Sequence, residues 1–279
     1  MKFGIALGAL NPHFHLDATR EAERLGFESV WLPEHLVFTR TMTRSPHPGQ
    51  DVPPVPPSAP IFDAFAYLAH LAAHTERLRL GTHVFNIGLR HPFTTARGVQ
   101  TVDLLSGGRF EFGIGASWLE QEWDAVQLDF ATRARRVDEA VAVCKQLWTE
   151  ETISHHGEFF SFADVVFEPK PVQKPWPPIL VGGETKAALR RAARLGDGWI
   201  GMGHTFESAG PQIAFLRARL VEHSRDDTSF QIVLGGSVRD SEDVARWESM
   251  GVTRLITSPW QRSPDCIEGM RRFAALYIS

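Results

Sequence analysis

The sequence predicts an α/β fold, a (β/α)8 TIM barrel with insertions at the rim formed by the carboxyl ends of its strands. Short apolar segments alternate with helical patterns from one end of the chain to the other. Eight such pairs fit into 279 residues, an ordinary length for one barrel domain. Several of the apolar segments also end in glycine, which would leave bare backbone at a common edge.

An open doubly wound sheet is the alternative fold for this alternation. Such sheets usually carry a glycine fingerprint directly after the first strand, and Gly8-Ala9-Leu10 is not that fingerprint. We therefore expect a single domain over 1–279.

Each expected strand is a short apolar run that closes in a turn signal or before a helical pattern. The strands are expected at 3–8, 29–32, 78–86, within the run 109–118, and at 179–181, 199–202, 231–235 and 254–257. The segment Gly113-Ile114-Gly115 inside the fourth run brings backbone to the surface just before a helix, where a ligand could contact peptide groups.

The expected helices follow from apolar residues at helical spacing and from end signals. They cover 17–25, 61–74, 92–105, 131–148, 185–195, 211–223, 240–250 and 264–276. Gly26 is a typical left-handed stop, and Pro92 suits the first turn of a helix.

Two stretches interrupt the alternation. Prolines throughout 36–60 preclude regular structure, and a loop of this length in a compact domain is commonly a lid, so we expect a lid loop there. Residues 152–177 are expected to form an inserted hairpin and a proline-rich return.

Composition excludes several classes of function. A formal net charge of -4 provides no basic surface for nucleic acid or anionic lipid. No signal peptide and no bilayer-spanning apolar run is evident, so we expect a cytoplasmic protein with no membrane partner. The only cysteines, Cys144 and Cys266, lie in helical patterns and are expected to pack. No histidine pair has metal-ligand spacing on a helix, so no metal site is predicted.

Polar and glycine residues at the strand ends would face one cavity of such a barrel. They are Asn11, His13, Glu34, His35, Thr82, His83, Asn86, the glycines that end strands four to six, and His204. His35 could exchange a proton near neutral pH. Glu34 either orients that ring or accepts backbone N–H groups at the end of its strand.

The Gly182-Gly183 pair precedes a helix and could hold one phosphate at the helix N-terminus. Lys186, in the first turn of that helix, could approach an anion, whereas Arg194 is expected on a solvated face.

Several segments together resemble those of one enzyme superfamily. They are Gly26 to His35, Arg77 to Val84, Leu89 to Pro92, Leu105 to Trp118, Phe167 to Gln173, Val181 to Gly183 and Arg191 to Trp199. The chain resembles the luciferase-like monooxygenase superfamily over nearly its whole length, and within it the branch of deazaflavin (F420)-dependent oxidoreductases.

This resemblance implies a flavin or deazaflavin ring held against the strand ends and backed by a non-proline cis peptide in strand three, by position His83-Val84. It implies a cofactor phosphate on the glycine pair after strand five and on the backbone after strand six. The implied cofactor-binding residues are Thr82, His83, Val84, Asn86, Gly115, Ala116, Val181, Gly182, Gly183, Gly201 and Met202. The implied catalytic pair is Glu34 and His35, with the histidine near ring and substrate.

Two positions depart from the pattern of the superfamily. Glu34-His35 stands where Asp-His is usual, and Trp118 stands where the sugar-phosphate dehydrogenase branch has a glutamate, which argues against glucose 6-phosphate as substrate. Asn11, Phe38 and Trp118 are the expected substrate-binding residues, and the aromatic pair suggests an apolar or planar small molecule.

The leading hypothesis is an F420-dependent oxidoreductase that moves a hydride between the deazaflavin C5 and an organic substrate. A reduced-FMN monooxygenase is the first alternative, and a flavin- or deazaflavin-binding protein without turnover is the second. Family habit also suggests a homodimer.

Overall fold

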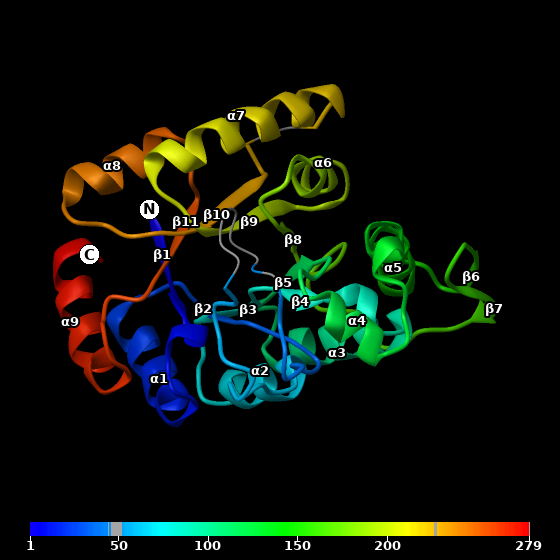
Figure 1. Ribbon diagram of the computed structural model, residues 1–279, viewed down its shortest axis with the longest axis horizontal. Helices are drawn as coiled ribbons and strands as arrows, with labels where there is room; N and C mark the ends of the chain where they lie inside the picture. Colours follow the sequence, from blue (N-terminus) through cyan, green and yellow to red (C-terminus); the bar gives the residue numbers. More distant parts are fainter. Residues whose placement is uncertain (44, 46–51, 226–227, 279) are drawn as a thin grey trace.

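The computed structural model describes residues 1–43, 45, 52–225 and 228–278, and a closed parallel barrel forms its centre (Figure 1). Its sheet consists of β1 (Lys2–Ala6), β2 (Ser29–Leu32), β3 (Arg79–Thr82), β4 (Phe85–Asn86), β5 (Phe110–Gly115), β8 (Ile179–Gly182), β9 (Gly198–Gly203), β10 (Gln231–Gly235) and β11 (Arg254–Thr257). Every pairing within this sheet is parallel. The β1–β11 and β3–β5 pairings close it, so all carboxyl ends meet at one mouth and the predicted barrel is confirmed.

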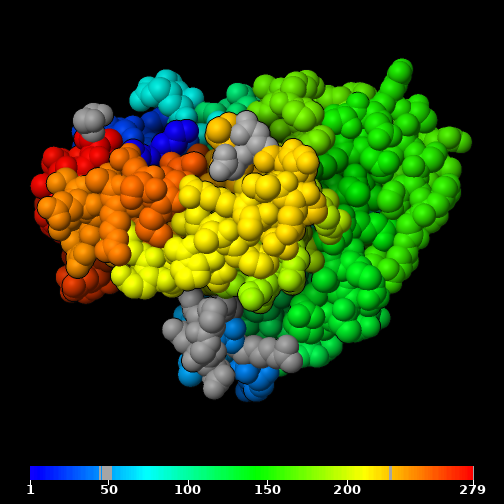
Figure 2. All heavy atoms as spheres, turned by 90° about the horizontal axis from the view of Figure 1, so that it is seen from above, coloured from blue at the N-terminus to red at the C-terminus, as the bar shows by residue number. Residues whose placement is uncertain are grey.

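Helices surround this sheet in Figure 1. They are α1 (His15–Leu25), α2 (Ala64–Ala72), α3 (Pro92–Leu105), α4 (Glu120–Ala125), α5 (Arg133–Thr149), α6 (Lys186–Leu195), α7 (Phe206–Glu222), α8 (Ser241–Ser249) and α9 (Cys266–Tyr277). Figure 2 shows α7, in yellow, and α8, in orange, covering one flank.

Local capping decides where the helices begin and end. Gly26 closes α1 with a φ of 84°, as predicted. The Asp63 side chain accepts from the Ala66 N–H, so α2 begins at Ala64 rather than at 61. Thr205 and Ser208 form a capping box that starts α7 at Phe206, which leaves Pro211 inside the helix rather than at its first turn as predicted.

The third predicted strand, 78–86, is interrupted. β3 ends at Thr82 and β4 begins at Phe85, and the peptide between His83 and Val84 is cis, which confirms the geometry implied by the resemblance. The two pieces occupy one place in the barrel, between β2 and β5.

Apolar side chains fill the interior of the barrel. Trp31 is 1% exposed and packs in one cluster with Leu180, Ile200, Val233 and Ile256. The barrel is therefore a packed core rather than a pore, and a ligand site is restricted to the mouth.

The predicted insertion contains a hairpin of β6 (Ile153–His156) and β7 (Ser161–Val165), which projects at the right edge of Figure 1. Its tip contacts α5, because the Glu139 carboxylate accepts the N–H groups of Phe159 and Phe160. The hairpin thus covers helices on the outside of the barrel. The predicted lid segment 36–60 includes residues 44 and 46–51, which lie outside the described residues, and its described part contains no helix or strand.

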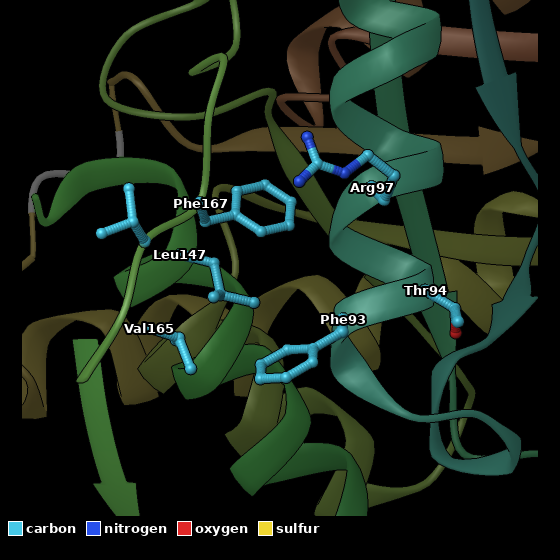
Figure 3. A pocket seen from close by; sticks show the side chains of 7 residues that line it. Phe93, Thr94, Arg97, Leu147, Val165 and Phe167 are labelled. Atoms are coloured by element: carbon cyan, nitrogen blue, oxygen red, sulfur yellow. The ribbon is translucent and has the colours of Figure 1, made fainter. Parts of the chain in front are cut away.

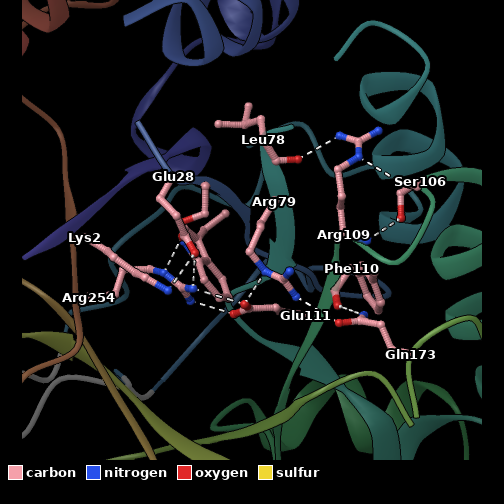
Figure 4. A network of polar contacts seen from close by, with 12 residues as sticks. Lys2, Glu28, Leu78, Arg79, Ser106, Arg109, Phe110, Glu111, Gln173 and Arg254 are labelled. Carbon is pink, nitrogen blue, oxygen red and sulfur yellow. Dashed lines mark hydrogen bonds and ion pairs between the residues drawn. The ribbon is translucent and has the colours of Figure 1, made fainter. Parts of the chain in front are cut away.

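A buried ion network closes the amino end of the barrel (Figure 4). Arg254, 2% exposed at the start of β11, donates to both carboxylate oxygens of Glu111 at 2.6 and 3.0 Å. Arg79 donates to the same carboxylate at 2.5 Å, and Glu28 accepts from Arg254 at 2.6 Å. Burial alone would raise the pKa of Glu111, but the guanidinium groups of Arg254 and Arg79 more than offset this and hold it below the ordinary value.

We expect Glu111→Gln to lower the free energy of unfolding by about 3 kcal/mol at pH 7, because it leaves the buried Arg254 without its main counter-charge. A carboxylate whose pKa is lowered in the folded state stabilises the fold above its ordinary pKa, so the difference between wild type and variant should shrink as the pH falls below 4.5. Denaturant unfolding of wild type and variant at pH 7 and at a pH below 4.5 measures this difference in stability. The control Glu222→Gln, in the surface pair with Arg219, should change stability by less than about 1 kcal/mol, and equal effects of the two variants would contradict the assignment.

Candidate functional site

His35 follows β2 at the mouth of the barrel and lies against two aromatic rings. Its ring centroid is 4.7 Å from that of Phe38 and 5.6 Å from that of Trp118, so the structure brings three predicted site residues together. Its Nδ1 lies 3.0 Å from a carboxylate oxygen of Glu122. Because a carboxylate only accepts, Nδ1 carries the proton in the neutral ring, and Nε2 is free to accept or, when protonated, to donate a proton.

Glu122, on α4, is a site residue that the sequence analysis missed. Its side chain is fully buried, and besides His35 it accepts the Leu36 N–H at 2.5 Å, the Val37 N–H at 3.4 Å and the Ser117 hydroxyl at 3.3 Å. This carboxylate holds both the imidazole and the beginning of the 36–60 segment. The sequence carries no clear signal for it, since Glu122 is flanked by Glu120 and Asp124 and nothing in residue type separates it from these acidic neighbours.

Glu34 does not orient the His35 ring, which corrects the first of the two interpretations from the sequence. Its side chain is fully buried, and its carboxylate accepts the Asn86 N–H at 2.9 Å and forms an ion pair with Arg90. The Asn86 side chain in turn donates to the Glu34 carbonyl at 3.3 Å. Burial raises the pKa of Glu34 above its ordinary value despite the charge of Arg90. These contacts of Glu34 and Asn86 tie the end of β2 to β4.

The cis peptide places Val84 across the ends of β5 and β8. A Cβ on Gly115 would lie 2.6 Å from Val84 Cγ2, and one on Gly182 would lie 2.8 Å from Val84 Cγ1. These two glycines therefore make room for Val84 as a floor at the mouth. Thr82 is fully buried and donates to the Gly113 carbonyl at 2.7 Å, so it supports this floor from below.

The His83 ring lies beside this floor, 6.5 Å from the Trp31 ring. Its Nε2 is buried and has no hydrogen-bond partner among the described residues. Burial lowers the pKa of His83 to about 4, while Glu184 and the Gly201 backbone act in the opposite direction. The ring is therefore neutral at pH 7, and its Nε2 is a group that a polar ligand edge could satisfy.

The predicted phosphate cradle after β8 and β9 contains a carboxylate. The Met202 N–H, an implied phosphate donor, donates instead to Glu184 at 2.7 Å. Thr185 caps α6 by accepting from the Ala188 N–H at 3.2 Å. The Nζ of Lys186, the predicted cation, lies 5.8 Å from the Phe215 ring of α7. The Met202 N–H is therefore not a free donor, which corrects the expectation for this residue.

The remaining residues that the sequence singled out have different environments. Val181 is 1% exposed, and its side chain packs in the main core. Gly201 makes room for Leu234 and His204, and Ala116 is half-buried. Asn11 is exposed; its side chain caps the turn Pro12–Phe14 and its N–H donates to Ser263 at 2.9 Å, away from the contacts of His35. Arg194 pairs with Asp138 on the outside, as expected.

The cysteines, the metal-ligating residue types and one outer cavity are the other candidates for a functional site within the described residues. Cys144 and Cys266 are fully buried, in agreement with packing roles. Within the described ranges, no group of three or more His, Cys, Asp or Glu could hold a metal ion, and no helix has the length and apolarity needed to cross a bilayer. A cavity of about 490 Å³ lies between α3, α5 and β7 (Figure 3), lined by Phe93, Thr94, Arg97, Leu147, Val165, Val166 and Phe167. It is outside the barrel mouth.

The mouth of this closed parallel barrel thus combines a histidine–carboxylate pair, His35 and Glu122, with a floor formed at a cis peptide. The chain belongs to the luciferase-like monooxygenase family, which matches residues 1–269.

Individual relatives agree with this assignment. An uncharacterised protein of Mycobacterium tuberculosis is 30% identical over 95% of this chain and 92% of its own length. The FMNH(2)-dependent dimethylsulfone monooxygenase of Pseudomonas putida is 31% identical over 63% of this chain and 49% of its own. The solved structure of an F420-dependent secondary alcohol dehydrogenase with an F420-acetone adduct has the same fold, with a TM-score of 0.79, 16% identity and coverage of 99% and 97% of the two chains.

Proposed function

We propose that this chain is an oxidoreductase that binds F420 at the mouth of the barrel, where a hydride passes between the deazaflavin C5 and an organic small molecule. The observation that carries the proposal is the His35–Glu122 pair, held between Phe38 and Trp118 at the same mouth as the Val84 floor.

The residues where the deazaflavin ring would bind suit a flat heterocycle. Val84 over Gly115 and Gly182 offers an apolar surface, and the unpaired His83 Nε2 offers one polar contact. The residues after β8 and β9, where the cofactor phosphate would bind, fit that phosphate less well, because Glu184 already accepts from the Met202 N–H. When bound, the deazaflavin would supply the hydride chemistry, for which protein side chains have no equivalent.

The protein would supply position and a proton. Glu122 fixes the tautomer and direction of the His35 ring, so that Nε2 of the neutral ring can remove a proton from a substrate hydroxyl as an alcohol is oxidised. In the reverse direction the imidazolium, which carries a proton on both nitrogens, can give the Nε2 proton to the substrate oxygen as a carbonyl is reduced. Phe38 and Trp118 would exclude water and bind an apolar or planar substrate. Asn11 remains a proposed substrate contact at the edge of the mouth.

A reduced-FMN monooxygenase is the second candidate, favoured by the named activity of the Pseudomonas putida relative. Equilibrium titration with F420 and with FMN separates the two. Tight F420 binding together with F420-dependent turnover of a carbonyl or alcohol panel is the expected result. Tight FMN binding with no F420 binding would reverse the order, and ring binding without turnover of any substrate would favour the non-catalytic alternative.

A further inference from the structure

Glu184 directly follows the Gly182-Gly183 pair and turns back over the mouth end of β9. One carboxylate oxygen accepts the Met202 N–H at 2.7 Å, and the other lies 2.8 Å from His204 Nε2. The side chains of Glu184 and His204 are only 7% and 6% exposed. The other His204 nitrogen, Nδ1, lies 3.0 Å from the Ser208 hydroxyl. The Glu184 carboxylate is therefore held at the rim by two contacts, one with the Met202 N–H and one with the His204 ring.

The surroundings keep this carboxylate charged. Burial alone would raise the pKa of Glu184, but its bonds to His204 and Met202 hold the pKa below the ordinary value. The ion pairs of Glu184 in the described part of the chain involve His204 and neither lysine nor arginine. The nearby cations of α6 are directed elsewhere, since Lys186 and Arg190 lie 5.8 and 5.6 Å from the Phe215 ring.

A phosphate at this position would meet the negative charge of Glu184 where the Met202 N–H would otherwise be a free donor. Anion sites at strand and helix ends depend on unpaired backbone N–H groups. Here the Met202 N–H is bonded to Glu184 and the Ala188 N–H to Thr185. A ligand phosphate would have to displace the Glu184 carboxylate or lie against it. Two negative charges in contact repel strongly in a partly buried site.

We propose that Glu184 is a resident anion that selects the cofactor by the charge of its phosphate, so that the site discriminates against a phosphomonoester such as that of FMN. This inference rests on the proposed function, because it assumes that the ring lies on the Val84 floor. A phosphomonoester carries about -1.5 to -2 charges at pH 7, whereas the phosphodiester of F420 carries one. Riboflavin has the FMN ring and no phosphate, so it avoids the repulsion.

The test is the dissociation constant of riboflavin, FMN and F420 for the wild type and for Glu184→Gln, measured by ligand fluorescence without turnover. Glutamine can still accept from the Met202 N–H, so the rim should remain folded, which circular dichroism and thermal unfolding check. We expect the variant to bind FMN at least about tenfold more tightly, F420 more tightly by a smaller factor, and riboflavin unchanged.

The control Glu207→Gln removes the same charge from the same rim, on a side chain that is 75% exposed, and should change each constant by less than about twofold. If Glu184→Gln leaves the affinity of every phosphate-bearing ligand that binds unchanged or weaker, the inference is wrong while the proposed function stands. If none of the three ligands binds either protein, the proposed function is overturned and the inference with it.

Discussion

Replacing His35 with alanine is expected to lower kcat/KM by a factor of about 100 to 10,000, because it removes the proposed proton donor at the mouth of the barrel. The affinity for F420 should change little, since His35 contacts Glu122, Phe38 and Trp118 rather than the Val84 floor. Steady-state kinetics with a substrate panel and a cofactor titration measure the two effects separately.

Added imidazole should restore part of the activity of His35→Ala. The control His156→Ala removes an exposed imidazole on β6 and should leave turnover unchanged. A His35→Ala enzyme with wild-type turnover would exclude His35 as the proton donor.

Replacing Glu122 with glutamine is expected to lower kcat by about 10- to 100-fold, with little change in KM or cofactor affinity. The amide keeps the volume of the side chain but loses the charge that fixes the His35 tautomer, so Glu122 acts as a positioning residue. The Leu36 N–H would also lose a charged acceptor, so we expect a stability loss of about 1 to 3 kcal/mol.

Asp124→Asn, on the exposed face of the same helix, is the matched control and should be neutral in both measurements. A purely structural role of Glu122 would lower stability while kcat of the folded fraction stays at the wild-type value, and that result would contradict the positioning role.

The fold was largely predictable from the sequence because its signals are local. The strands at 29–32, 231–235 and 254–257 and the helix at 92–105 have the predicted bounds, set by apolar runs, glycine and proline. The errors occur where a nearby side chain overrides the pattern. Thr205 starts α7 five residues before 211, the start predicted from Pro211.

The candidate site was predictable only in part. His35, Phe38 and Trp118 lie close in sequence to strand ends, and their meeting follows from the barrel topology. Glu122 and Glu184 could not be identified, because what distinguishes them is the backbone N–H that each accepts from a segment distant in the sequence. Such contacts depend on how loops fold back over the mouth, and residue type and spacing do not encode this.

A crystal structure of the protein soaked with F420 tests the central claim most directly. We predict the deazaflavin ring on the Val84 floor, with an edge at His83 Nε2 and the C5 side facing His35. A ring bound instead in the cavity beside Phe93 and Arg97, or a mouth kept closed by the protein's own side chains, would contradict this account.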